Sequence, residues 1–266
     1  MPHVRRADHC HTPRGRMLIL GLIGFLAVGL SLGMLGGGGS ILAVPVLVHV
    51  LGLPASVAVP MSLPVVGAAA ALGAYRRWRL GQLKLRLVAI FAAGTMVASF
   101  AAARLGADIA DRPRLLLFTA VMLIAATLMW RRSRAPLPVE TSTETPQPHV
   151  GVLVGASLGV GVLTGLVGVG GGFLIVPALV GVLGLGMAEA TATSLAVIAL
   201  NTGAASAGWW GRVELDWPLT VMVTVAALVG MLLGTALAPR VQARTLTRAF
   251  AGLLIVVGVF MLVKEL

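Results

Sequence analysis

The chain has 266 residues, of which 58% are hydrophobic and 11% are charged, and its mean hydropathy is +0.99. Soluble domains have about 25% charged residues, so the composition excludes a soluble globular protein and indicates an integral membrane protein. The 20 lysine and arginine residues against 9 acidic residues give a net charge of +11. Aromatic residues make up only 5% of the chain, too few for a basic surface that stacks on bases, so nucleic acid is excluded as a partner.

Residues 1–16 form a polar and basic leader. His9, Cys10 and His11 lie close together in it, but a fourth ligand is missing, and no metal site is predicted. Because Cys10 is the only cysteine, an internal disulfide is excluded. No small-residue cleavage pattern closes the apolar run that follows, so we interpret this run as the first helix rather than as a signal peptide.

Eight charge-free apolar runs follow the leader, and most of the positive charge lies in the short connections between them. Several runs are long enough to cross about 30 Å of hydrocarbon, and basic connections of this kind set the orientation of a membrane protein. The pattern predicts an all-α polytopic membrane protein with about eight transmembrane helices in a lipid bilayer. The runs are Met17–Leu35, Ile41–Tyr75, Leu87–Ala103, Leu115–Trp130, Val150–Leu185, Ala190–Gly211, Leu219–Ala238 and Ala249–Val263.

The chain contains two copies of one pattern. Residues 33–54, "GMLGGGGSILAVPVLVHVLGLP", align without a gap with residues 165–186, "GLVGVGGGFLIVPALVGVLGLG", at an offset of 132, and 13 of the 22 residues are identical. The same offset pairs Ser62 with Ser194. We predict a tandem duplication, with a first transmembrane repeat over 17–132, a polar linker over 133–149 and a second transmembrane repeat over 150–266.

Each copy contains a glycine-rich turn followed by a short apolar segment with a central proline, Pro45 or Pro177. At 13 residues, Ile41–Leu53 would span only about 20 Å as a helix. We therefore predict two short re-entrant or broken segments, interrupted by helix-breaking prolines. Segments of this kind at equivalent places in two repeats point to the binding site of a transporter. The glycines leave backbone N–H groups free at a helix start, which suits an anion.

Candidate substrate-binding residues follow from this arrangement. The glycines and Ser40 would present backbone N–H groups, and small polar side chains of the next helix would donate hydrogen bonds, although Ser and Thr in membrane helices more often bond to their own backbone. Close helix packing is the alternative role, and we expect it for Gly29, Gly33 and Gly36 on one helix and for Gly161, Gly165 and Gly168 on the other. The candidates are Gly38, Gly39, Ser40, Ser62, Gly170, Gly171, Gly172, Thr193, Ser194, Asn201 and Thr202.

Other functional classes lack the residues that they need. Gly39 is followed by Ser40 and Ile41 rather than by the lysine of a phosphate-binding loop, so ATP is not implied and no cofactor is predicted. Eight of the nine acidic residues lie in connections or tails, and no nucleophile has a base at useful spacing, so we do not expect an enzyme. His49 is interpreted as a packed or interfacial residue and Glu189 as an acid at a helix start. A passive anion channel stays open as an alternative.

Two topologies are compatible with the duplication. If the glycine segments re-enter, each repeat crosses the membrane four times, both repeats face the same way, and the leader, "RRWRLGQLKLR" and "RRSR" are cytoplasmic. If the segments cross fully, the repeats are inverted, "PRVQARTLTR" becomes cytoplasmic, and the leader lies outside. We favour the first topology because it places most of the positive charge inside.

The segments "GGGGSILAVP" and "GVGGGFLIVP", the stretch "ATATSLAVIALNTGAASAG" and the closing "ALAPRVQARTLTRAFAGLLIVVGVFML" resemble the sulfite exporter TauE/SafE family of membrane permeases. The resemblance covers nearly the whole chain outside the leader and the linker. It implies a permease of the bacterial inner membrane that moves small anions such as sulfite, sulfonates or related organic anions without ATP. The anion, the direction of transport and the coupling ion do not follow from the motifs, and a homo-oligomer is left open.

One departure within the duplication concerns the helix after the glycine segment. Pro60 and Pro64 stand where the second repeat has Ala192 and Ala196, and Asn201 has no polar counterpart in the first repeat. The two repeats are therefore expected to contribute unequally to the site.

Overall fold

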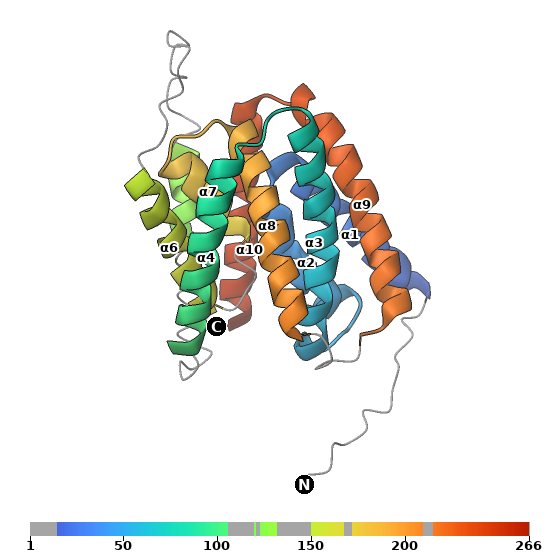
Figure 1. Cartoon of the computed structure of the whole chain (residues 1–266). Coiled ribbons are helices and arrows are strands. Elements are labelled where there is room, and N and C mark those ends of the chain that lie inside the picture. Colours follow the sequence, from blue (N-terminus) through green and yellow to red (C-terminus); the bar gives the residue numbers. More distant parts are fainter. Residues whose placement is uncertain are drawn as a thin grey trace.

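The computed structural model describes residues 15–105, 120, 123–131, 150–167, 172–209 and 215–265, and every secondary-structure element in this part of the chain is helical (Figure 1). The all-α prediction is therefore confirmed for these residues. The longer helices are α1 (Gly15–Leu35), α3 (Ala55–Arg79), α4 (Leu85–Leu105), α6 (Val150–Val167), α7 (Gly172–Gly181), α8 (Met187–Trp209), α9 (Trp217–Leu237) and α10 (Ala243–Glu265). The short elements are α2 (Ser40–Pro45), the 3₁₀ turns η1 (Gly37–Gly39) and η3 (Ala238–Arg240), and the π-helical turn η2 (Val46–Val50).

Several described helices have the dimensions of membrane spans. Four are long and apolar enough to cross a bilayer, namely Gly15–Leu35, Ser56–Arg79, Leu85–Ala102 and Trp217–Arg240. Large apolar side chains such as Ile19, Val97 and Val221 are exposed on the surface of the helices. Exposure to water would be unfavourable for them, whereas exposure to lipid hydrocarbon is not. The chain is therefore a multi-pass membrane protein. The total of about eight transmembrane helices and the duplication stay predictions, although the bounds of α4 and α9 differ by the same 132 residues.

Three pairs of long helices pack along each other: α1 with α9, α4 with α6, and α3 with α8. Small residues lie at their contacts. A Cβ atom added to Gly29 would lie 2.9 Å from the backbone nitrogen of Met231, and one added to Gly33 would lie 2.6 Å from the carbonyl oxygen of the same residue. One added to Gly161 would lie 2.7 Å from the Cβ of Ala98. The expected packing role is therefore confirmed for Gly29, Gly33 and Gly161. It is wrong for Gly36, which lies beyond the end of α1 in a turn, and Gly168 lies outside the described residues.

The contacts between α3 and α8 fix the relative direction of these two central helices. The Cβ position of Gly67 lies 2.8 Å from Oγ1 of Thr202, whereas that of Gly73 lies 3.1 Å from a side-chain carbon of Leu195. Residue numbers rise along α3 as they fall along α8, so the helices are antiparallel, as Figure 1 also shows. Since α3 and α8 occupy equivalent places in the two predicted repeats, their equivalent helices are inverted.

The favoured topology, in which both repeats face the same way, is therefore wrong for the described helices. The cause lies in the segment after the first glycine turn, which returns along the length of α1. The Cβ position of Gly24 lies 2.8 Å from the side chain of Val46, and that of Gly21 lies 2.6 Å from the side chain of Leu51. Because this return pass carries the chain back to the end where α1 began, α3 starts there, and the first repeat gains one pass.

Cysteine labelling tests the inverted arrangement. Leu80 follows the end of α3 and is 70% exposed, and Trp217 begins α9 and is 52% exposed. α9 runs parallel to α3, because Arg76 near the end of α3 bonds Thr235 near the end of α9. In a Cys10→Ser background, we therefore expect Leu80→Cys and Trp217→Cys to react with a membrane-impermeant maleimide from opposite sides. Labelling from the same side would contradict the inversion.

Candidate functional site

The chain reverses at the first glycine turn. α1 ends at Leu35, and Gly36 follows with φ 73° and ψ −121°, a conformation that favours glycine because a side chain would clash with the backbone. A Cβ atom on Gly36 would also lie 2.6 Å from Oγ of Ser194 and 3.1 Å from Cα of Thr191. The turn is thus pressed against α8, and its backbone faces two hydroxyl-bearing residues.

Pro45 and Pro177 both lie within helical stretches of the two short segments that follow the glycine-rich stretches. α2 ends at Pro45, but the chain continues directly into the π-helical turn η2, and α7 runs through Pro177 to Gly181. A proline removes one backbone hydrogen bond and disturbs the preceding turn, which the wider η2 turn accommodates after Pro45. In α7, neighbouring side chains such as Val176 and Leu179 are buried and hold the helix in place. Because α2 ends at Pro45 and α7 continues through Pro177, the helix-breaking role of the prolines stays a prediction; the reversal of the chain in the first segment precedes the proline, at Gly36.

The starts of the two short helices meet. A Cβ atom on Gly172, the first residue of α7, would lie 2.9 Å from Oγ of Ser40, the first residue of α2, and 2.9 Å from the side chain of Ile198. Ser40 and Gly172 occupy equivalent positions in the two predicted repeats. The two short helical segments therefore meet near their starts, although η1 precedes α2 without a break and the N–H group of Ser40 donates to the carbonyl of Gly37.

One face of α8 lines this region. Ser194, Ile198 and Thr202 follow one another at the four-residue spacing that keeps side chains on one helix face, and all three are buried. Ser194 lies against the glycine turn, and Ile198 against the start of α7. The hydroxyls donate to their own helix, Ser194 to the carbonyl of Thr191 over 2.9 Å and Thr202 to that of Ile198 over 2.7 Å. To donate to an anion, each hydroxyl would have to rotate away from its helix.

Two of the candidate glycines lie against other neighbours. A Cβ atom on Gly38 would lie 2.6 Å from the ring of Phe250 on α10, and one on Gly39 would lie 2.5 Å from the backbone nitrogen of Leu32 on α1. These contacts indicate a packing role for both residues in this conformation. Gly170 and Gly171 lie outside the described residues, so their place in the site stays a prediction.

The other polar candidates are buried or partly buried along α3 and α8. Ser62 donates to the carbonyl of Val59 over 2.8 Å, and Thr193 is 1% exposed. Asn201 donates from Nδ2 to Oγ1 of Thr95 on α4 over 3.3 Å, and its Oδ1 is buried without a partner in the described part of the chain. The structure thus brings Ser40 and Gly172 together and places Ser194 against the glycine turn. Thr202 lies against Gly67 of α3, and Asn201 lies at the α4–α8 contact.

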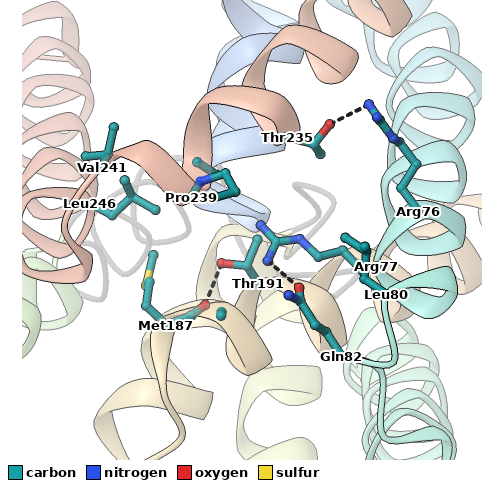
Figure 2. A pocket seen from close by; sticks show the side chains of 12 residues that line it. Arg76, Arg77, Leu80, Gln82, Met187, Thr191, Thr235, Pro239, Val241 and Leu246 are labelled. Carbon is teal, nitrogen blue, oxygen red and sulfur yellow. Dashed lines mark hydrogen bonds between the residues drawn. The ribbon is translucent and has the colours of Figure 1, made fainter.

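A cavity of about 310 Å³ opens where the ends of α3, α8, α9 and α10 come together (Figure 2). Arg77 is 8% exposed and reaches between Thr191 and Pro239, whereas Arg76 points toward Thr235. Thr191 also contacts Gly36, so one residue borders both the cavity and the glycine turn. The lining residues are Arg76, Arg77, Leu80, Gln82, Met187, Ala188, Thr191, Thr235, Ala238, Pro239, Val241 and Leu246.

Charges at this end of the bundle are largely positive. Arg76 donates to Oγ1 of Thr235 over 3.1 Å, and Arg77 donates to Oε1 of Gln82 over 3.0 Å. Glu189 lies in the first turn of α8, as expected for an acid at a helix start, and forms an ion pair with Lys84 over 2.9 Å. His49 is exposed on η2, away from this cluster. No group of three or more metal-ligating side chains occurs in the described residues.

Comparison with known proteins places the chain in a family. Residues 20–261 match the family model "Sulfite exporter TauE/SafE". The chain belongs to the sulfite exporter TauE/SafE family. A TauE/SafE relative from Xylella fastidiosa (strain 9a5c), "Probable membrane transporter protein", is 33% identical over 246 residues, which cover 88% of this chain and 91% of the relative. "Probable membrane transporter protein YdhB" of Bacillus subtilis (strain 168) is 30% identical over 251 residues, which cover 90% and 99%. No solved structure matches the chain.

Family membership and these relatives make this TauE/SafE protein a membrane transporter. Reasoning from the sequence missed the cavity, because it treated "RRWR" as connection charge that only sets topology. One signal was available: Ala74 and Tyr75 lead directly into Arg76 and Arg77, with no proline or turn-forming residue between them, so a helix can continue through the two arginines. α3 does continue to Arg79, and this places the Arg77 side chain inside the bundle.

Proposed function

We propose that the protein is a secondary transporter of small anions, namely sulfite, sulfonates or related organic anions, in the bacterial inner membrane. The observation that carries the proposal is the convergence of the α2 and α7 starts at Ser40 and Gly172. Free N–H groups and aligned peptide dipoles make a helix start favourable for a negative charge. In a transporter with repeated halves, interrupted helices that meet at the repeat interface are the usual place of the substrate.

The surroundings support an anion rather than a cation at this place. Ser194 is buried against the glycine turn, and Thr202 is buried on the same face of α8; both carry hydroxyls that can donate after rotation. In the low dielectric of the bundle, the attraction between a helix start and an anion is weakly screened. No carboxylate of the described residues takes part in these contacts, and Glu189 is already paired with Lys84.

The distribution of charge suggests the orientation. Arg76, Arg77, Arg79, Lys84 and Arg240 all lie at the end of the bundle that carries the cavity. By the positive-inside rule this end faces the cytoplasm. The cavity then lies on the cytoplasmic side of the meeting helix starts.

Flux measurements test the proposal. Purified protein in proteoliposomes is expected to move at least one anion from a panel of sulfite, sulfate, thiosulfate, taurine, sulfoacetate and small carboxylates, measured with and without a pH gradient. Protein-free vesicles are the control. Flux that saturates with concentration supports a transporter, whereas conductance without saturation identifies the alternative, a passive anion channel. No flux of any anion would refute both.

A further inference from the structure

The buried arginine of the cavity lacks a countercharge in the described part of the chain. Arg77 is 8% exposed, and the hydrogen bond that the structure shows for its guanidinium goes to the neutral Gln82. The one ion pair among the described residues joins Lys84 to Glu189 and does not include Arg77. Removing a charge from water costs several kcal/mol unless an opposite charge compensates, so an anion in the cavity would stabilise this arginine.

The walls of the cavity suit a small anion. The described residues that form them include no acidic side chain, and two hydroxyls, those of Thr191 and Thr235, lie beside the two arginines. Met187 and Ala188, at the start of α8, also line it, so a helix start adds partial positive charge. The volume of about 310 Å³ leaves room for a small oxyanion together with several waters, each of which occupies about 30 Å³ in the liquid.

We propose that this cavity is a second anion-binding site, with Arg77 as its charged ligand and a small oxyanion, such as a sulfonate, as its occupant. A guanidinium presents parallel N–H groups that match two oxygens of such an anion. Thr191 borders the cavity and contacts Gly36. An anion held by Arg77 would therefore be separated from the glycine turn by Thr191. The identity of the ligand rests on the proposed function, whereas the existence of the site does not.

A single cysteine in the cavity wall provides a measurement that is independent of transport. Val241 lines the cavity and is partly buried. In a Cys10→Ser, Val241→Cys background, the sulfonate-bearing methanethiosulfonate reagent is expected to react about tenfold faster than its trimethylammonium analogue, because the cavity is electropositive. Arg77→Gln should lower this ratio about fivefold. Arg79→Gln, a charge loss at an exposed position outside the cavity, is the matched control and should change it by less than about twofold.

Protection by a ligand completes the test. Sulfoacetate is expected to slow the reaction of Val241→Cys with neutral methyl methanethiosulfonate by about threefold or more, and Arg77→Gln should abolish this protection. Arg77→Lys keeps the charge but not the paired N–H groups, so it should keep the reagent ratio and weaken the protection. An unchanged ratio in Arg77→Gln, or no protection in the parent protein by sulfoacetate or sulfate, would overturn the proposal.

The flux panel separates this site from the proposed function. Protection without flux of any anion would leave the Arg77 site standing and refute transport. Flux without protection would refute the Arg77 site and leave transport standing.

Discussion

Valine in place of Gly172 is expected to lower anion flux by about twofold to thirtyfold while the protein remains folded in the membrane. The added side chain would fill the space between the starts of α2 and α7, because a Cβ atom there lies 2.9 Å from Oγ of Ser40 and 2.9 Å from the side chain of Ile198. Both contacts involve side-chain atoms, which can shift, so the fold should survive. Loss of an anion from a helix start costs ~0.3–2 kcal/mol, and about 1.4 kcal/mol corresponds to a factor of ten.

The matched control for Gly172 lies in the same helix. Gly181 ends α7, and a Cβ atom added to it meets no atom within 4 Å, so Gly181→Val should keep flux near that of the parent protein. Gly172→Ala should give an intermediate flux. The measurement is initial flux in proteoliposomes, normalised to inserted protein. If Gly172→Val inserts and transports like the parent protein, the helix starts are not the site, and the hypothesis moves to Asn201, whose Oδ1 is buried without a partner in the described part of the chain.

The second large effect concerns stability. Gly161→Val is expected to lower the free energy of unfolding by at least ~1–3 kcal/mol, the usual cost of overpacking. A Cβ atom on Gly161 would lie 2.8 Å from the carbonyl oxygen of Thr95 and 2.9 Å from its Cα. Backbone atoms of α4 cannot move aside as a side-chain end can, so the α4–α6 contact must open.

Gly159 offers a control in the same helix. A Cβ atom on Gly159 meets no atom within 4 Å, and Gly159→Val makes the same change in helix propensity as Gly161→Val. Thermal unfolding in detergent and abundance in the membrane are the measurements. A shift of about 2–4 °C in Tm is expected per kcal/mol for a chain of this size. Equal stability of the two variants would show that α4 and α6 do not pack as described.

Much of the fold could be predicted because it depends on local sequence. Whether a segment enters hydrocarbon depends on the summed hydropathy of about 20 neighbouring residues, and these can be read directly. The run Met17–Leu35 therefore corresponds to α1, Gly15–Leu35, and the run Leu219–Ala238 to α9, Trp217–Leu237. The glycine-rich turn that the first copy predicts is observed at Gly36.

The direction of the return pass and the neighbours of single residues depended on contacts between distant segments. Counting charges favoured repeats that face the same way, but Val46 and Leu51 pack down the length of α1, and this extra pass inverts α8 relative to α3. Gly39 was expected to face the substrate, yet it lies against the backbone of α1.

The cavity around Arg77 could not be predicted from the sequence, because it too depends on contacts between distant segments. Its walls come from residues between Arg76 and Leu246 on four helices, and no window of the sequence contains them together. Composition determined that this chain enters a membrane and where its helices are interrupted, because hydrophobic transfer and backbone propensity are local properties. Only the packing of the helices decided which arginine is buried and which glycine meets which neighbour, because those contacts form when separate helices exclude lipid and water from between them.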